Sequence, residues 1–191
     1  YKVFRKIIIP HASELDEDIF KDSYNKNPVV IGNWTSNLKG RELLDSLKNK
    51  LPNFTFKNMN LNFENKSIEE YNKIKQLYYI QGDIYLCLSK VEGASYSTID
   101  AMMNNLLIVS TDVGIMENEI SKDSFKMINW NDLNIDSICK KINDIWNNRK
   151  NYENKSRKEY FNLISWKKWK DLWYKTIDQF NNLQIDCMIE N

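Results

Sequence analysis

Residues 83–97 have the sequence DIYLCLSKVEGASYS, an apolar run that ends in a turn of small and polar residues. A short apolar run bounded by turn signals is typical of a strand buried on both faces, as in a parallel sheet. Gly93 and the small residues after it favour a tight turn that lets a ligand approach the backbone closely. The stretch therefore predicts a strand, a turn and the start of a helix.

The same alternation of strand and helix continues on both sides of this stretch. Ser67 and Glu70 form the pattern of a capping box at the start of one further helix. We expect strands at residues 29–32, 53–58, 83–88, 106–109 and 125–128 and helices at 38–51, 67–78, 95–103, 136–148, 152–163 and 166–183, with a short helix between the last two strands. This order predicts an α/β fold: a Rossmann-like parallel sheet flanked by helices, with a helical C-terminal tail.

Charge and cysteine content argue against several classes of function. The net charge is +1, with 27 Lys and Arg against 26 Asp and Glu, so we expect no nucleic-acid surface. The three cysteines Cys87, Cys139 and Cys187 are widely spaced, which favours reduced thiols and a cytoplasmic location. His11 is the only histidine and has no cysteine cluster beside it, so we expect no metal site. No apolar run approaches the ~20 residues that would span a bilayer.

The candidate ligand site lies at three turns, because parallel sheets bind ligands outside the carboxyl ends of their strands. These turns are residues 32–40, 89–97 and 111–116. In the middle turn, free backbone N–H groups and the helix dipole favour a phosphate. Glu92 and Asp100 have seven residues between them, so both can face one ligand and accept hydrogen bonds from sugar hydroxyls. The same spacing fits about equally well with an alternative, in which both acids are exposed to solvent on a helix and bind no ligand.

The chain resembles the family 4 glycosyltransferases of the two-domain GT-B kind. Residues 92–102 (EGASYSTIDAM) and 106–114 (LLIVSTDVG) are similar to the family signature, in which two glutamates also have seven residues between them. Further pieces match in order: Ile8–His11 with Asp18–Phe20 resembles the linker into the donor domain, Ile31-Gly32 with Lys39-Gly40 resembles the family's glycine loop, and Ser165-Trp166 resembles the start of the last long helix. The resemblance covers nearly the whole chain.

This resemblance implies the donor half of a retaining glycosyltransferase that uses a UDP- or GDP-linked sugar, without cofactor or metal. Glu92 and Lys39 would be catalytic, with Glu92 on hydroxyls of the donor sugar and Lys39 on the departing diphosphate. Asp100 would bind the ribose hydroxyls. The implied donor-binding residues are Asn33, Lys39, Gly40, Glu92, Gly93, Ala94, Ser95, Tyr96, Ser97, Thr98 and Asp100, with Met59 and Asn60 near the base.

Several positions depart from the family pattern. Asp100 replaces the usual glutamate and is shorter by one methylene, and Asn33 replaces an arginine that would face the diphosphate. Lys39 then carries that charge without this arginine. Two other functions stay open for this reason: a nucleotide- or nucleotide-sugar-binding module without turnover, and a degenerate structural or assembly domain.

The resemblance also divides the chain into three parts. Residues 1–27 form a linker, residues 28–165 the nucleotide-sugar-binding domain, and residues 166–191 a C-terminal helix that packs back on the fold or on a missing N-terminal domain. Trp166, Trp169 and Trp173 share one face of this helix, with lysines nearby. Such a face can lie on a membrane or pack against protein, and we favour packing. The expected partners are a nucleotide sugar and an acceptor-binding domain or partner chain.

Overall fold

The computed structural model describes residues 12–59, 64–114, 116, 121, 123–129, 133–163 and 165–189, with the side chains of 179–189 left undescribed. Five strands form one parallel sheet in the order β2-β1-β3-β4-β5. The strands are β1 Val29–Gly32, β2 Thr55–Asn58, β3 Ile84–Cys87, β4 Leu107–Thr111 and β5 Lys126–Ile128. The predicted Rossmann-like parallel sheet is therefore confirmed.

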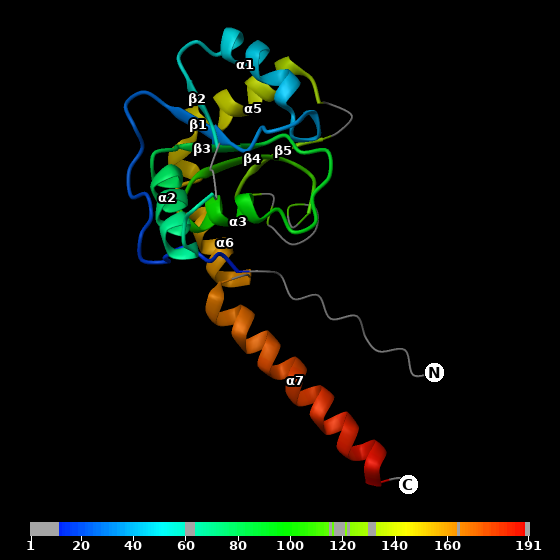
Figure 1. Cartoon of the computed structure of the whole chain (residues 1–191). Helices are drawn as coiled ribbons and strands as arrows, with labels where there is room; N and C mark the ends of the chain where they lie inside the picture. The colour runs from blue at the N-terminus through cyan, green and yellow to red at the C-terminus, as the bar shows by residue number, and fades with distance from the viewer. Residues whose placement is uncertain are drawn as a thin grey trace.

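Helices cover both faces of the sheet (Figure 1). On one face lie α1 Leu44–Lys50 and α5 Ile135–Asn147; on the other lie α2 Ile68–Ile80, α3 Tyr96–Met103 and α6 Lys155–Leu163. Successive residues of a strand point to opposite faces, so Ile84 and Leu86 pack in the first layer and Tyr85 and Cys87 in the second. Burial on both faces explains why β3 is apolar throughout and β4 is apolar except at its last two residues, Ser110 and Thr111.

Local sequence signals set several helix ends. The Ser67 hydroxyl accepts a hydrogen bond from Glu70 N at 3.1 Å and the Glu70 carboxylate accepts one from Ser67 N at 2.8 Å, which confirms the predicted capping box of α2. The Asn134 side chain caps α5 in a similar way by accepting from Ser137 N. The short helix predicted between β4 and β5 falls mostly on residues outside the described part of the chain.

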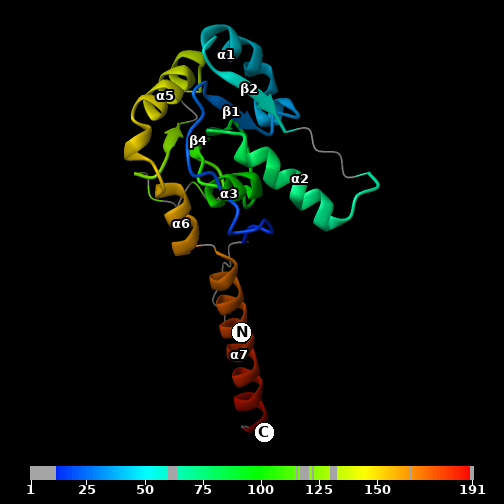
Figure 2. The ribbon, with the colours of Figure 1, turned by 90° about the vertical axis from the view of Figure 1, so that its left-hand side faces the viewer.

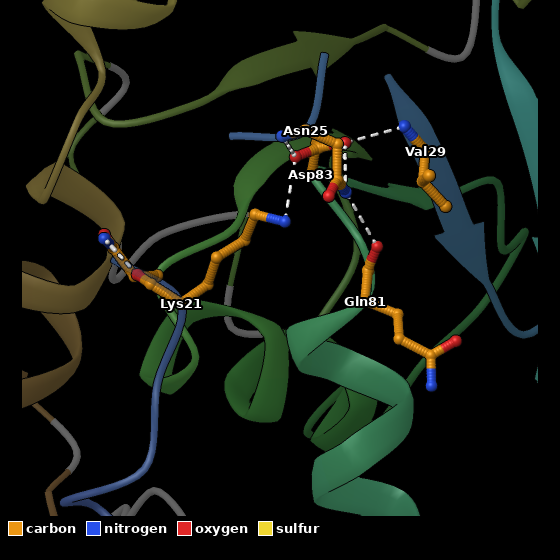
Figure 3. A network of polar contacts seen from close by, with 6 residues as sticks. Lys21, Asn25, Val29, Gln81 and Asp83 are labelled. Carbon is orange, nitrogen blue, oxygen red and sulfur yellow. Dashed lines mark hydrogen bonds and ion pairs between the residues drawn. The ribbon is translucent and has the colours of Figure 1, made fainter. Parts of the chain in front are cut away.

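Residues 12–27, here called the N-terminal strap, lie along the domain and are tied to it by buried polar contacts (Figure 2). Lys21 Nζ lies 2.9 Å from Asp83 Oδ1, and the two side chains are 7% and 0% exposed. The Asp83 carboxylate also accepts hydrogen bonds from Asn25 N, Asn25 Nδ2 and Val29 N, so the network joins the strap to the starts of β1 and β3 (Figure 3). Closer to the start of the strap, Arg157 of α6 donates to Glu17 O at 2.6 Å.

The last helix, α7 Trp166–Ile189, leads away from the sheet (Figures 1 and 2). The rings of Trp166 and Trp169 stack with centroids 4.7 Å apart, and Trp173 follows at 6.1 Å from Trp169. The Glu17 carboxylate accepts a hydrogen bond from Trp166 N, so the strap also holds the start of α7. Among the described residues, no helix is long and apolar enough to cross a membrane.

Candidate functional site

The turns that follow β1, β3 and β4 are joined to one another at the carboxyl edge of the sheet. Lys90 N, after β3, donates to Leu38 O at 2.8 Å, in the turn after β1. Thr111 Oγ1, at the end of β4, donates to Ser89 O at 2.7 Å. The three turns proposed from the sequence therefore form one surface, as expected where parallel strands end together.

Two glycines allow these turns to approach closely. Gly40 has a φ of 78°, and a Cβ at this position would lie 2.5 Å from Leu88 Cβ. Gly114 has a φ of 59°, and a Cβ there would lie 3.0 Å from Gly93 O and 3.4 Å from Glu92 Cβ. A side chain at either glycine would be strained and would displace the turn after β3. The glycine that ends the VSTDVG stretch thus supports the turn that carries Glu92.

Lys39 and Glu92, the two predicted catalytic residues, form an ion pair with each other. Ser89 Oγ also donates to Glu92 Oε1 at 2.7 Å, which fixes the carboxylate from the base of the turn. The Lys39 and Glu92 side chains are 27% and 16% exposed, so both can reach a ligand on the surface. The arrangement supplies an ammonium donor that suits a diphosphate and a carboxylate acceptor that suits hydroxyls.

The start of α3 lies directly after this pair. Ser95 has a left-handed backbone with a φ of 51°, and Ser95 O accepts from Thr98 N and Ile99 N. The Ser95 and Thr98 hydroxyls are buried and bonded to each other at 2.7 Å, so they face the protein interior and not the solvent. The positive end of the helix dipole makes this a favourable place for an anion.

Asp100 lies one layer deeper than Glu92. The residue is 2% exposed; Ser13 Oγ of the strap donates to its Oδ1 at 2.6 Å, and Lys75 Nζ of α2 lies 2.5 Å from its Oδ2. Burial raises the pKa of Asp100, while Lys75 and Ser13 act to lower it. The predicted ribose-binding acid is thus in contact with two protein groups, Ser13 and Lys75.

Sequence reasoning missed Lys75 and Ser13. Lys75 shares the inward face of α2 with Tyr71 and Tyr79 at spacings of four residues, and a lysine within an aromatic stripe is the signal that could have singled it out. Ser13 offered no signal, because its partner is 87 positions away in the sequence.

A pocket of about 370 Å³ opens beside Asp100. Its volume is at the lower end of the range typical of small-molecule sites. It is bounded by the strap, by the first turns of α2 and by the start of α3. The lining residues are Ala12, Glu14, Lys66, Ser67, Ile68, Tyr71, Asn72, Lys75, Tyr96 and Asp100. The pocket thus adjoins the same helix start that follows the Lys39–Glu92 pair.

The other predicted residues lie around these two features. Asn33, in the turn after β1, has a buried Oδ1 without a hydrogen-bond partner in the described part of the chain. Gly93 is exposed in the turn before α3, and Ala94 and Ser97 are partly buried. Met59 is 7% exposed within the core, and Asn60 lies outside the described residues. No group of three or more His, Cys, Asp or Glu side chains that could hold a metal ion occurs among the described residues.

The sequence matches no family model and no curated protein, so the comparisons rest on solved structures. Sucrose-phosphate synthase from Thermosynechococcus elongatus has a TM-score of 0.70 at 13% identity, over 93% of this chain and 52% of that one. The C-terminal domain of the glycosyl transferase group 1 family protein LpcC from Francisella tularensis has a TM-score of 0.55 at 15% identity, over 78% of this chain and 97% of that domain.

The pneumococcal O-GlcNAc transferase GtfA has a TM-score of 0.57 at 16% identity, over 89% of this chain and 38% of its own length. This chain therefore spans about half the length of sucrose-phosphate synthase and less of GtfA, but nearly the whole of the LpcC domain. What these likenesses show is the fold: a Rossmann-like α/β domain that matches the C-terminal domains of GT-B glycosyltransferases.

Proposed function

We propose that this chain is the donor-binding domain of a glycosyltransferase. It would bind a nucleotide-diphosphate sugar, UDP- or GDP-linked, and transfer the sugar to an acceptor held by a second domain or chain. The observation that carries the proposal is the Lys39–Glu92 ion pair at the carboxyl edge of the sheet, directly before the start of α3. The structural likeness to glycosyltransferases supports it, and one of them, GtfA, was solved with UDP and GlcNAc.

The chemistry of transfer needs charge stabilisation at the departing diphosphate, where negative charge increases in the transition state. Lys39 supplies a cation there, and the N–H groups at the start of α3 supply neutral donors. Glu92 would accept hydrogen bonds from hydroxyls of the donor sugar and so fix its orientation. Charge stabilisation of this kind requires no metal. Retention of the anomeric configuration is the outcome that the family resemblance favours.

A binding titration tests this proposal. We expect UDP or GDP to raise the melting temperature of the wild-type chain, because a ligand at 100 times its Kd adds about 2.7 kcal/mol to stability. Lys39→Met should weaken binding of the diphosphate by about 10-fold or more, as the loss of a hydrogen bond to a charged group predicts. Lys50→Met is the matched control, because Lys50 also pairs with an acid, Asp136, on the surface of α1.

A folded sample that binds no nucleoside diphosphate in the titration would refute the proposal. If Lys39→Met and Lys50→Met weaken nucleotide binding equally, Lys39 does not contact the diphosphate. Only the fold would then still support the proposal.

Binding without turnover is the second function to be tested. It is favoured by the state of Asp100, whose carboxylate is engaged by Ser13 and Lys75, and by Asn33 in place of a cation. Hydrolysis of the nucleotide sugar separates the two: slow release of free sugar that is lost in Glu92→Gln supports transfer chemistry. A chain that binds the donor tightly and releases no sugar, even with its acceptor-binding partner present, supports the binding module.

A further inference from the structure

Lys75 and Asp100 face the same pocket as a pair. Lys75 comes from the third turn of α2 and Asp100 from α3, and both line the pocket of about 370 Å³. Their side chains are 17% and 3% exposed. An ion pair in such surroundings incurs a desolvation cost that its own attraction only partly offsets, so it contributes little to stability by itself. Its position in a pocket wall points to a role in binding.

The donors and acceptors of the pair are only partly used. An ammonium group has three donors, and Asp100 is the ion-pair partner of Lys75 within the described residues. A carboxylate has about four acceptor positions. Ser13 donates to Asp100 Oδ1, whereas Oδ2 is buried, forms the ion pair with Lys75 and has no hydrogen-bond partner among the described residues. The pair can therefore still offer N–H donors from one partner and lone pairs from the other to a ligand in the pocket.

We propose that Lys75 is a second ribose contact, so that the Lys75–Asp100 pair binds the vicinal diol of a nucleotide. One hydroxyl donates to the Asp100 carboxylate, and a hydroxyl oxygen accepts from the Lys75 ammonium. This inference rests on the proposed function and assigns a residue to its nucleoside end. A hydroxyl is both donor and acceptor, so a carboxylate beside an ammonium is complementary to two adjacent hydroxyls.

The short side chain of Asp100 explains why Lys75 would be needed as a second contact to the ribose. Aspartate at position 100 is one methylene shorter than glutamate, and its side chain is 3% exposed in the pocket wall. Lys75 has a long flexible side chain whose head group reaches that carboxylate from the neighbouring helix. It can thus reach a hydroxyl that the shorter acid cannot reach alone. Ser13 fixes the other carboxylate oxygen from the strap and acts as a positioning residue.

The test compares ribose with deoxyribose ligands. The dissociation constants of UDP and GDP and of their 2′-deoxy and 3′-deoxy analogues are measured by calorimetry on the wild type, Lys75→Met, Lys75→Arg and Lys73→Met. In the wild type we expect a preference for the ribonucleotide of about 10- to 100-fold, as hydrogen bonds to charged groups supply. Lys75→Met should bind the ribonucleotide no more than about 3-fold more tightly than its deoxy analogues. Lys75→Arg should keep most of it, because charge and donors remain.

Lys73→Met is the matched control, since Lys73 lies on α2, pairs with Glu69 and is 72% exposed. It should leave the preference unchanged. A purely structural role for Lys75 predicts another result: Lys75→Met would lower the melting temperature and weaken ribose and deoxyribose ligands equally, and this would overturn the inference. If Lys75→Met does not fold, Lys75→Gln and Lys75→Arg give the same comparison, with loss of preference expected in the glutamine variant.

The failures of the two proposals are distinct. A wild-type chain that binds nucleoside diphosphates with no preference for ribose overturns the diol assignment and leaves the donor site intact. A wild-type chain that binds none of them overturns the donor site and the diol assignment together.

Discussion

Lys21→Met should destabilise the domain by about 3 kcal/mol at neutral pH. Lys21 is 7% exposed and pairs with Asp83, which is 0% exposed, so the substitution leaves a carboxylate buried without its counter-charge. Breaking a buried ion pair in this way costs about 3–5 kcal/mol. The lower end applies here, because Asp83 keeps three hydrogen bonds from the main chain and side chain of Asn25 and from Val29 N.

A loss of about 3 kcal/mol is a large fraction of the free energy of unfolding of a typical domain. Domains are stable by about 5–15 kcal/mol, and urea lowers that by about 1–3 kcal/mol per molar. A loss of 3 kcal/mol therefore moves the urea midpoint down by about 1 M or more. Tryptophan fluorescence follows the transition, since Trp34 lies 1% exposed in the core of the sheet. Lys73→Met, on the exposed face of α2, is the control and should leave the midpoint where it is.

The double variant Lys21→Met with Asp83→Asn completes a cycle. The amide removes the unpaired charge, so the double variant should be more stable than the sum of the single losses by about 1–3 kcal/mol. The reasoning is refuted if Lys21→Met unfolds at the wild-type midpoint, or if the two losses simply add. Either result would mean that the strap is not anchored by this pair. Nucleotide affinity offers a second readout, because the same strap carries Ser13.

Three further predictions concern the site. Burial raises the pKa of Asp100, and Ser13, Lys75 and Glu14 face its carboxyl group. Protonation of Asp100 therefore stabilises the folded state at low pH, and this contribution to the free energy of unfolding is lost as pH rises through the raised pKa. Nucleotide affinity should fall over the same range as pH is lowered, and in Lys75→Met the loss should begin at a higher pH; profiles of Kd against pH check both. Gly114→Ala should cost about 1–2 kcal/mol because of its positive φ, whereas Gly93→Ala, where a Cβ meets no described heavy atom within 4 Å, should be neutral by urea unfolding. Glu92→Gln should bind free UDP or GDP at least as tightly as the wild type but lose the added affinity of the sugar conjugate, as calorimetry with both ligands would show.

Most of the fold could be predicted from the sequence because its strands carry the signal of burial on both faces. β3 and β4 are buried at every residue and are mostly apolar, as is typical of a parallel sheet covered by helices on both faces. The convergence of the three turns followed from the same premise, since parallel strands end at a common edge. The capping box at Ser67 and Glu70 was predictable because both partners lie within one helical turn.

Side-chain contacts between elements that are distant in the sequence could not be predicted. Lys75 precedes Asp100 by a whole strand and two turns, and Ser13 and Lys21 lie in a polar segment without apolar periodicity. Their partners are decided by where α2, α3, the start of β3 and the strap meet, which the local sequence does not encode. The sequence offered Asp100 as a ligand for ribose, but its burial and its two protein partners appear only once these elements are assembled.

The two ion pairs suggest how one helix could accommodate both ends of a nucleotide sugar. Without ligand, a lone lysine near the start of α3 would be repelled by the positive end of the helix dipole, and Glu92 offsets this charge. A diphosphate at that position would provide Lys39 with a stronger partner, which would release the Glu92 carboxylate to accept hydroxyls of the sugar. Eight positions further along, Asp100 and Lys75 can exchange part of their mutual interaction for a diol in the same manner. Each pair would then be a preformed, neutral site, and the ligand would replace an internal contact instead of a hydration shell. On this argument the diphosphate would meet Lys39, the sugar would meet Glu92 and the ribose would meet both Lys75 and Asp100, so the conjugate should be more sensitive than the free nucleotide to Glu92→Gln.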